Sequence, residues 1–305
     1  MRVRWSRTDF LVLCVVLIWA TTFSVIKSGL REMGPLSFAT IRFTSAAGLM
    51  LAFVWILEGA PTIRREDWLR VVVVGLTVIG VYQALFTVGL RYTTASNSSL
   101  MLASIPAWTV LFAGASRQER FSALQIVGIL MSFVGVAMAI RGAHGEFALS
   151  WESVRGDALT LIAAALYGIG GVVSKPLLLR YSSLRVMTMA IVCGSIFLVV
   201  VSVPELAAQH WDSVSLGTWL GVAYASLFGA AFAFVIWFKS IGEIGVSRTS
   251  IYNNLIPPVA MLIAFGTLGE RFSPLQLLGA GIVLAGVTLT RFAQPKGEEV
   301  GQQVV

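Results

Sequence analysis

The sequence predicts an all-α membrane protein whose ten transmembrane helices form two inverted repeats of five helices each. Three observations lead to this fold class: an apolar composition, apolar runs of helical length, and a motif that occurs twice. The 305 residues are 57% hydrophobic and only 12% charged, with a mean hydropathy of +0.83. Soluble domains carry roughly 25% charged residues, so this composition indicates an integral membrane protein.

Apolar runs cover nearly the whole chain. A membrane-spanning helix needs roughly 20 largely apolar residues, whereas a barrel strand needs only about 9–11. The runs have helical length and predict spans over 10–29, 35–57, 69–90, 95–115, 122–140, 157–177, 186–203, 215–238, 249–269 and 273–291. The basic N-terminus is followed by no convincing small-residue cleavage site, so we interpret it as the first span rather than a signal peptide.

The basic residues orient the spans. Of the 22 Lys and Arg residues, fifteen lie on the same side of the membrane as the N-terminus, six lie on the opposite side, and Arg42 lies within a span. Cytoplasmic loops carry the excess of Lys and Arg, which predicts that both termini are cytoplasmic and that the number of spans is even. Because the basic residues are dispersed, the net charge of +7 does not indicate a nucleic-acid partner.

A repeated motif explains the even number. Residues 119–128 read ERFSALQIVG and residues 270–279 read ERFSPLQLLG, at an offset of 151. At an offset of 148, WATTFSVIK in the first span faces YGIGGVVSK in the sixth. A unit with five spans inserts its second copy upside down, and such inverted repeats are typical of secondary transporters. We expect a first repeat over 1–141, an external linker over 142–155, a second repeat over 156–293 and a cytoplasmic tail over 294–305.

The doubled motif itself indicates a structural corner. In each copy a Glu-Arg pair is followed by Phe and then by a Ser that can cap the next helix. We interpret Glu119-Arg120 and Glu270-Arg271 as turns that fix a helix hairpin within each repeat.

Several of these motifs occur together in one known family. WATTFSVIK in the first span, PLSFATIRF in the second, a Ser seven residues before a Pro in the fourth, and ERFSxLQxxG resemble the EamA-type drug/metabolite transporters over the full length. The resemblance implies ten helices, two EamA units and cytoplasmic termini in a bacterial inner membrane. Within the family the chain is similar to exporters of amino acids and related metabolites, including the aromatic amino-acid (YddG-like) branch.

Polar and aromatic side chains at mid-membrane depth are candidates for lining a pathway, because polar groups are costly in lipid. Each has a structural alternative, such as helix bridging or close packing. The polar candidates are Tyr82, Gln83, Ser99, Tyr252, Asn253 and Asn254, and the aromatic ones are Trp19, Trp108, Tyr167 and Trp237. Pro106 and the pair Pro257-Pro258, at equivalent places in the two halves, indicate either helices bent beside a central cavity or static kinks needed for packing.

Three basic residues near or within spans complete the candidates. Lys27 and Lys175 are repeat partners that either snorkel to the headgroups or approach an anionic group of the substrate. Arg42 matches an arginine of the family and is expected to tie the second span to neighbouring carbonyls.

The sequence shows no carboxylate in the middle of any span, no ATPase motif and no zinc or nucleophile signature. Cationic-drug antiport, an ATP motor and an enzyme are therefore disfavoured, and we expect no cofactor and no metal. The interpretation is a secondary exporter of small metabolites, amino acids including aromatic ones, working by alternating access. A channel, or an exporter of other amphipathic metabolites or drugs, is the alternative. The expected partners are a small-molecule substrate and the lipid bilayer, in a monomer or a weak homodimer.

Overall fold

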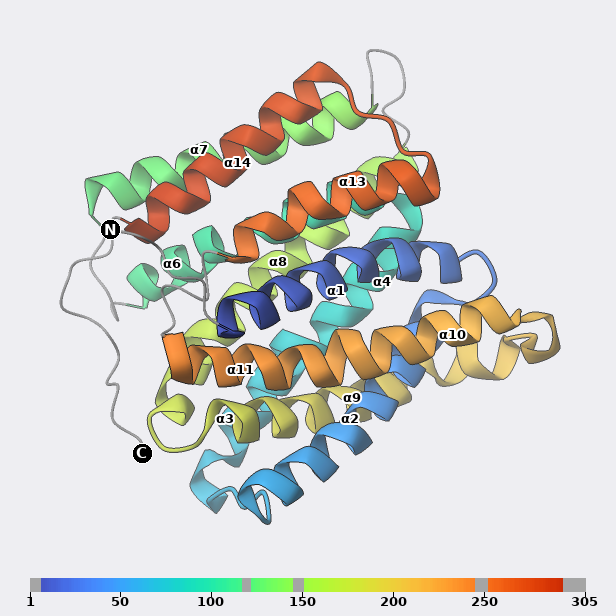
Figure 1. Ribbon diagram of the computed structural model, residues 1–305, viewed down its shortest axis with the longest axis vertical. Helices are drawn as coiled ribbons and strands as arrows, with labels where there is room; N and C mark the ends of the chain where they lie inside the picture. Colours follow the sequence, from blue (N-terminus) through green and yellow to red (C-terminus); the bar gives the residue numbers. More distant parts are fainter. Residues whose placement is uncertain (1–6, 117–121, 145–150, 245–251, 293–305) are drawn as a thin grey trace.

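A computed structural model describes residues 7–116, 122–144, 151–244 and 252–292 of the chain. All regular secondary structure within these ranges is helical (Figure 1). The helices of the first half are α1 (Arg7–Gly29), α2 (Pro35–Glu58), η1 (Arg65–Asp67), α3 (Trp68–Val74), η2 (Gly75–Gly80), α4 (Val81–Tyr92), α5 (Ala95–Ala103), α6 (Ile105–Ala115) and α7 (Ala123–His144). Those of the second half are α8 (Trp151–Leu178), α9 (Ser183–Ala208), η3 (Trp211–Ser213), α10 (Leu216–Tyr224), η4 (Ala225–Phe232), α11 (Ala233–Ile244), η5 (Asn253–Leu255), α13 (Ile256–Leu268) and α14 (Pro274–Phe292).

The helices group into the ten expected spans. Eight helical stretches in the described part of the chain are long and apolar enough to cross a membrane, and two shorter apolar helices supply the ninth and tenth spans. The prediction of an all-α fold with ten helices is therefore confirmed. The fifth and sixth spans extend further than expected, to His144 and from Trp151, so parts of the predicted linker 142–155 are helical.

The outer faces of the helices are apolar, as a lipid-facing surface requires. Large hydrophobic side chains stay exposed along several spans; Trp55, Leu69, Val200 and Leu262 are 65–75% exposed. A soluble protein rarely shows apolar surface on this scale. The exposed apolar belt therefore agrees with the membrane assignment.

The last helix of each half packs against the other in antiparallel fashion. Figure 1 shows α7 and α14 side by side along one edge of the molecule. A Cβ built on Gly135 would lie 2.7 Å from the carbonyl oxygen of Gly279, and one on Gly142 would lie 2.4 Å from the backbone nitrogen of Gln276. Residue numbers thus rise on one helix as they fall on the other. Small residues permit such backbone contact in membranes.

The second helices of the two halves form another antiparallel pair. The hydroxyl of Thr40 on α2 donates to Ser202 on α9 at 2.9 Å, and the hydroxyl of Ser195 donates to the carbonyl of Phe43 at 3.0 Å. When equivalent helices pair antiparallel, their parent halves point in opposite directions. The two repeats are therefore inverted, as the sequence predicts.

Both halves also carry the same irregularities. The third and eighth spans contain π-helical stretches, η2 and η4, which fall at equivalent positions when the numbering is shifted by 151. The fourth span breaks at Ser104, two residues before Pro106, and the ninth contains the 3₁₀ turn η5 directly before the helix that carries Pro257. The prolines thus interrupt equivalent helices, as expected from the N–H that proline lacks.

Candidate substrate-binding site

A cavity of about 390 Å³ lies between the two halves. Volumes of 300–1,000 Å³ are typical of sites for small molecules. Its walls come from eight of the ten spans in the described chain, namely the first to the fourth and the sixth to the ninth. Most of the lining is aliphatic or aromatic, and polar groups are few. Such a surface suits an amphipathic solute better than a strongly hydrated ion.

The structure brings most of the predicted site residues together around this cavity. Those that line it are Trp19, Tyr82, Gln83, Ser99, Tyr167, Trp237, Asn253 and Asn254. The amide nitrogen of Asn254 donates to the hydroxyl of Thr288 on α14 at 3.0 Å, so this side chain also bridges two helices. The hydroxyl of Ser99 donates to the carbonyl of Ser96 at 2.7 Å. Both side chains therefore combine a structural contact with a position on the wall.

Two aromatic groups form parts of the wall. In the first, the ring centroid of Trp19 lies 5.1 Å from that of Trp237 and 5.7 Å from that of Phe234. In the second, Tyr82 and Tyr167 contact edge to face at 5.1 Å. Aromatic pairs favour these spacings. Trp19 and Tyr167 are repeat partners, so the two aromatic groups reflect the internal symmetry of the fold.

Four predicted residues lie elsewhere. Trp108 packs against Phe133, with ring centroids 4.7 Å apart, and does not line the cavity. The hydroxyl of Tyr252 donates to the carboxylate of Asp9 at 2.8 Å and so joins the ninth span to the first. Lys27 and Lys175 lie near the ends of α1 and α8, and neither is among the lining residues.

The sequence interpretation treated Arg42 as structural, but the structure places it in the cavity wall. Its Nε donates to the carbonyl of Ala225 at 3.3 Å, as the expected contact with a neighbouring carbonyl requires. It is also 7% exposed and faces the cavity. A charged side chain inside a span is a functional candidate by default. This position within the second span is the one feature of the sequence that could have identified Arg42 as a site residue.

Toward one end of the molecule the lining of the cavity on α1 stops at Ile26, and the next residue, Lys27, bonds to backbone carbonyls; we call this the closed end. The Nζ of Lys27 donates to the carbonyls of Leu90, Arg91 and Thr93 at 2.8, 3.0 and 2.6 Å, at the end of α4 and in the residue that follows it. A cation is favourable at the C-terminus of a helix, where carbonyls lack intrahelical partners. The hydroxyl of Thr93 also donates to Asp157 on α8. These bonds join the first, third and sixth spans at this end.

The repeated Glu-Arg motif does more than form the hairpin corner expected of it. Glu270 caps the N-terminus of α5 in the other repeat: its carboxylate accepts from the backbone nitrogens of Ala95 and Ser96 at 2.7 and 3.1 Å. A carboxylate at a helix N-terminus satisfies orphan N–H groups. Glu270-Arg271 does lie in the turn between α13 and α14, as expected, but the carboxylate contacts the other repeat as well; Glu119-Arg120 lies outside the described residues. The expected caps are confirmed, since Ser273 and Ser122 accept from the backbone nitrogens of Gln276 and Gln125.

Short turns tie the halves together at both ends. At the closed end, Glu32 in the α1–α2 turn accepts from the backbone nitrogen of Ser215 and the hydroxyl of Thr218, each at 2.8 Å. Hydrogen bonding by Ser215 and then Thr218 lowers the pKa of Glu32, so the carboxylate is charged at neutral pH.

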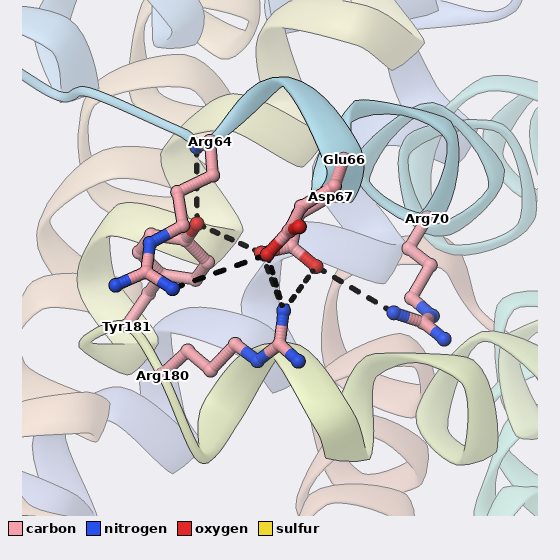
Figure 2. Close-up of polar contacts among 6 residues, drawn as sticks. All are labelled: Arg64, Glu66, Asp67, Arg70, Arg180 and Tyr181. Carbon is pink, nitrogen blue, oxygen red and sulfur yellow. Dashed lines mark hydrogen bonds and ion pairs between the residues drawn. The ribbon is translucent and has the colours of Figure 1, made fainter.

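At the opposite end, the α8–α9 turn contacts the start of the third span (Figure 2). Nη1 of Arg180 lies 3.0 Å from Asp67, and the hydroxyl of Tyr181 donates to the same carboxylate at 2.9 Å. The hydrogen bond to Asp67 and its charge raise the pKa of Arg180 above its ordinary value. The cavity reaches toward this end, where Leu178 and Ser183 line it. Polar contacts thus join the two halves at both ends, while the cavity itself extends toward the end with Leu178 and Ser183.

Replacing Asp67 by Asn is expected to lower the thermal stability of the purified protein. The side chain of Asp67 is 1% exposed and pairs with Arg180 and Tyr181, so its loss costs about 1–3 kcal/mol. Glu66 pairs with the same Arg180 but is 64% exposed, and Glu66→Gln is expected to cost less than about 0.5 kcal/mol. Melting temperatures in detergent test both variants. Equal shifts would contradict the assignment of Asp67 as the buried member of the cluster.

The comparisons with known proteins agree with this architecture. The model of the EamA-like transporter family matches residues 6–141 and 154–292, which together form most of the chain. The chain belongs to the EamA-like transporter family. It is therefore a multi-pass membrane transporter and not an enzyme.

Relatives of this EamA transporter include proteins named as exporters. A probable terminal-alkyne amino-acid exporter of Streptantibioticus cattleyicolor is 30% identical over 93% of both chains. A probable amino-acid metabolite efflux pump of Salmonella typhimurium is 27% identical, with 94% of this chain and 96% of the relative covered. A solved crystal structure matches with a TM-score of 0.66 at 16% identity, covering 93% of this chain and 98% of the other, and shows a shared fold.

Proposed function

We propose that this EamA transporter is a secondary exporter of small metabolites, amino acids including aromatic ones, and that it works by alternating access. The observation that carries the proposal is the cavity between inverted halves. At one end Lys27 bonds the first span to the third, and at the other end the cavity extends to Leu178 and Ser183. A central site with one closed end is what alternating access requires.

The orientation of the chain supports export. The end with Leu178 and Ser183 is the side that the excess of Lys and Arg places in the cytoplasm. In this state, in a bacterial inner membrane, a solute would enter the cavity from the cytoplasm. The apolar and aromatic lining fits amino acids with large side chains, and the relatives named as amino-acid exporters support the same substrate class.

Flux into proteoliposomes tests the proposal. Purified protein is expected to carry labelled amino acids, with aromatic ones among them, faster than empty vesicles admit them. Leu102→Trp adds volume on the cavity wall and is expected to reduce this flux at least tenfold. Leu262→Trp is the matched control, since Leu262 is 70% exposed on the outer face. If no amino acid of a broad panel crosses, the substrate assignment is wrong, and discrete single-channel currents would contradict a carrier.

A further inference from the structure

Arg42 carries the only charge among the lining residues in the described chain. It lies on α2, is 7% exposed, and no carboxylate lines the cavity with it in the ranges described. A buried charge without an opposite charge nearby is costly unless other groups or a ligand compensate it. The residue therefore needs an explanation beyond packing.

The contacts of Arg42 leave most of its donors unused. The guanidinium has five N–H donors, and Nε uses one of them on the carbonyl of Ala225 in η4, at 3.3 Å. The guanidinium carbon lies 4.7 Å from the centroid of the Phe43 ring. Among the described residues, neither Nη1 nor Nη2 has a hydrogen-bond acceptor. The bond at Nε holds the side chain in place and leaves the forked end of the guanidinium to pair with another group.

The same cavity holds an unused acceptor. The amide oxygen of Gln83 is buried and has no hydrogen-bond partner in the described structure. A buried polar atom without a partner costs about 1–3 kcal/mol, so this oxygen is also a place for a donor group of a ligand. Gln83 adjoins Tyr82, whose ring forms the edge-to-face pair with Tyr167. One cation, one bare acceptor and aromatic rings thus line a single cavity.

We propose that Arg42 is the carboxylate receptor of the cavity and that the amide oxygen of Gln83 accepts a hydrogen bond from the amino group of the same solute. The inference rests on the proposed transport function and narrows its substrate to zwitterions and other carboxylates. Guanidinium and carboxylate form two parallel hydrogen bonds with defined geometry. The aromatic walls then contact the side chain of the solute.

Three compounds that share one phenyl-bearing skeleton separate the roles of the two residues. L-Phenylalanine carries both charged groups, 3-phenylpropionate lacks the amino group, and phenethylamine lacks the carboxylate. Binding to purified wild-type protein, measured by calorimetry, is expected to be at least tenfold weaker for phenethylamine than for either carboxylate. Equal affinities for all three would overturn the proposal without any variant.

Variants then assign the effect to residues. Arg42→Gln is expected to abolish the preference for carboxylates. Gln83→Leu is expected to weaken the binding of phenylalanine about tenfold and to leave the affinity for 3-phenylpropionate unchanged. If Arg42→Gln fails to yield monodisperse protein, Arg42→Lys keeps the charge but loses the fork, and is expected to reduce the preference at least threefold. An unchanged preference in the folded variants would overturn the assignment. Because binding is read without flux, carboxylate selectivity in a protein that moves no amino acid would refute the proposed function and not this site.

Discussion

Gly279→Leu is expected to abolish recovery of folded protein. A Cβ at Gly279 would lie 2.6 Å from the backbone nitrogen of Ala139 and 2.7 Å from the carbonyl oxygen of Gly135, both on α7. These are backbone atoms and cannot swing aside as the end of a long side chain can. Overpacking in a core commonly costs about 1–3 kcal/mol, and separating two helices along their contact is expected to cost more.

The same helix offers a matched control for this substitution. A Cβ at Gly281, two residues further along α14, meets nothing within 4 Å. Gly281→Leu is therefore expected to yield normal amounts of monodisperse protein, as measured by size-exclusion chromatography of a fluorescent fusion in detergent. Equal yields and melting temperatures for the two variants would show that α7 and α14 are not in backbone contact.

Lys27→Met is expected to open the closed end of the cavity. The variant removes three hydrogen bonds from a charged donor to the carbonyls that end α4. A hydrogen bond to a charged group contributes about 1.5–3 kcal/mol, and 1.4 kcal/mol is tenfold in a population. The state that is closed at this end is therefore expected to lose at least tenfold in population.

Labelling of an introduced cysteine measures this change. Ile26 lines the cavity near the closed end, and Ile26→Cys, in a background without Cys14 and Cys193, reports access from that face. An impermeant thiol reagent, added on the side where α1 ends, is expected to label this cysteine slowly in the parent and at least tenfold faster with Lys27→Met. Arg31→Met removes a charge from an exposed neighbour and is expected to change little. An unchanged labelling rate with Lys27→Met would show that this residue does not hold the end closed.

The sequence predicted the spans because each is a continuous apolar run, and the bilayer fixes the length that such a run needs. The second span was expected over 35–57 and runs from Pro35 to Glu58. The largest differences are six residues: the sixth span begins at Trp151 instead of the predicted 157, and the helix of the eighth runs to Ile244 instead of the predicted 238. Helix capping and tertiary contacts, rather than hydropathy, decide where a helix ends outside the membrane core.

The lining of the cavity was harder to predict, because the direction in which a side chain points depends on contacts between residues that are far apart in the sequence. Tyr252 and Asn253 are neighbours in one polar cluster, yet Asn253 lines the cavity and Tyr252 bonds to Asp9, 243 positions away. Glu270 belongs to a conspicuous local motif, but its hydrogen bonds reach into the other repeat. A pattern along one chain segment does not contain such partners.

The π-helical stretches have a consequence for the shape of the solute chamber. Each holds one more residue per turn than an α-helix would, so it turns everything after it by about 100° relative to a regular helix. In the third span this rotation follows Val74 and precedes Gln83 and Phe86, yet all three residues line the cavity. The one extra residue in each half therefore decides which of the following side chains line the cavity. Deleting it would rotate those side chains away from the cavity, although the helix would still cross the bilayer.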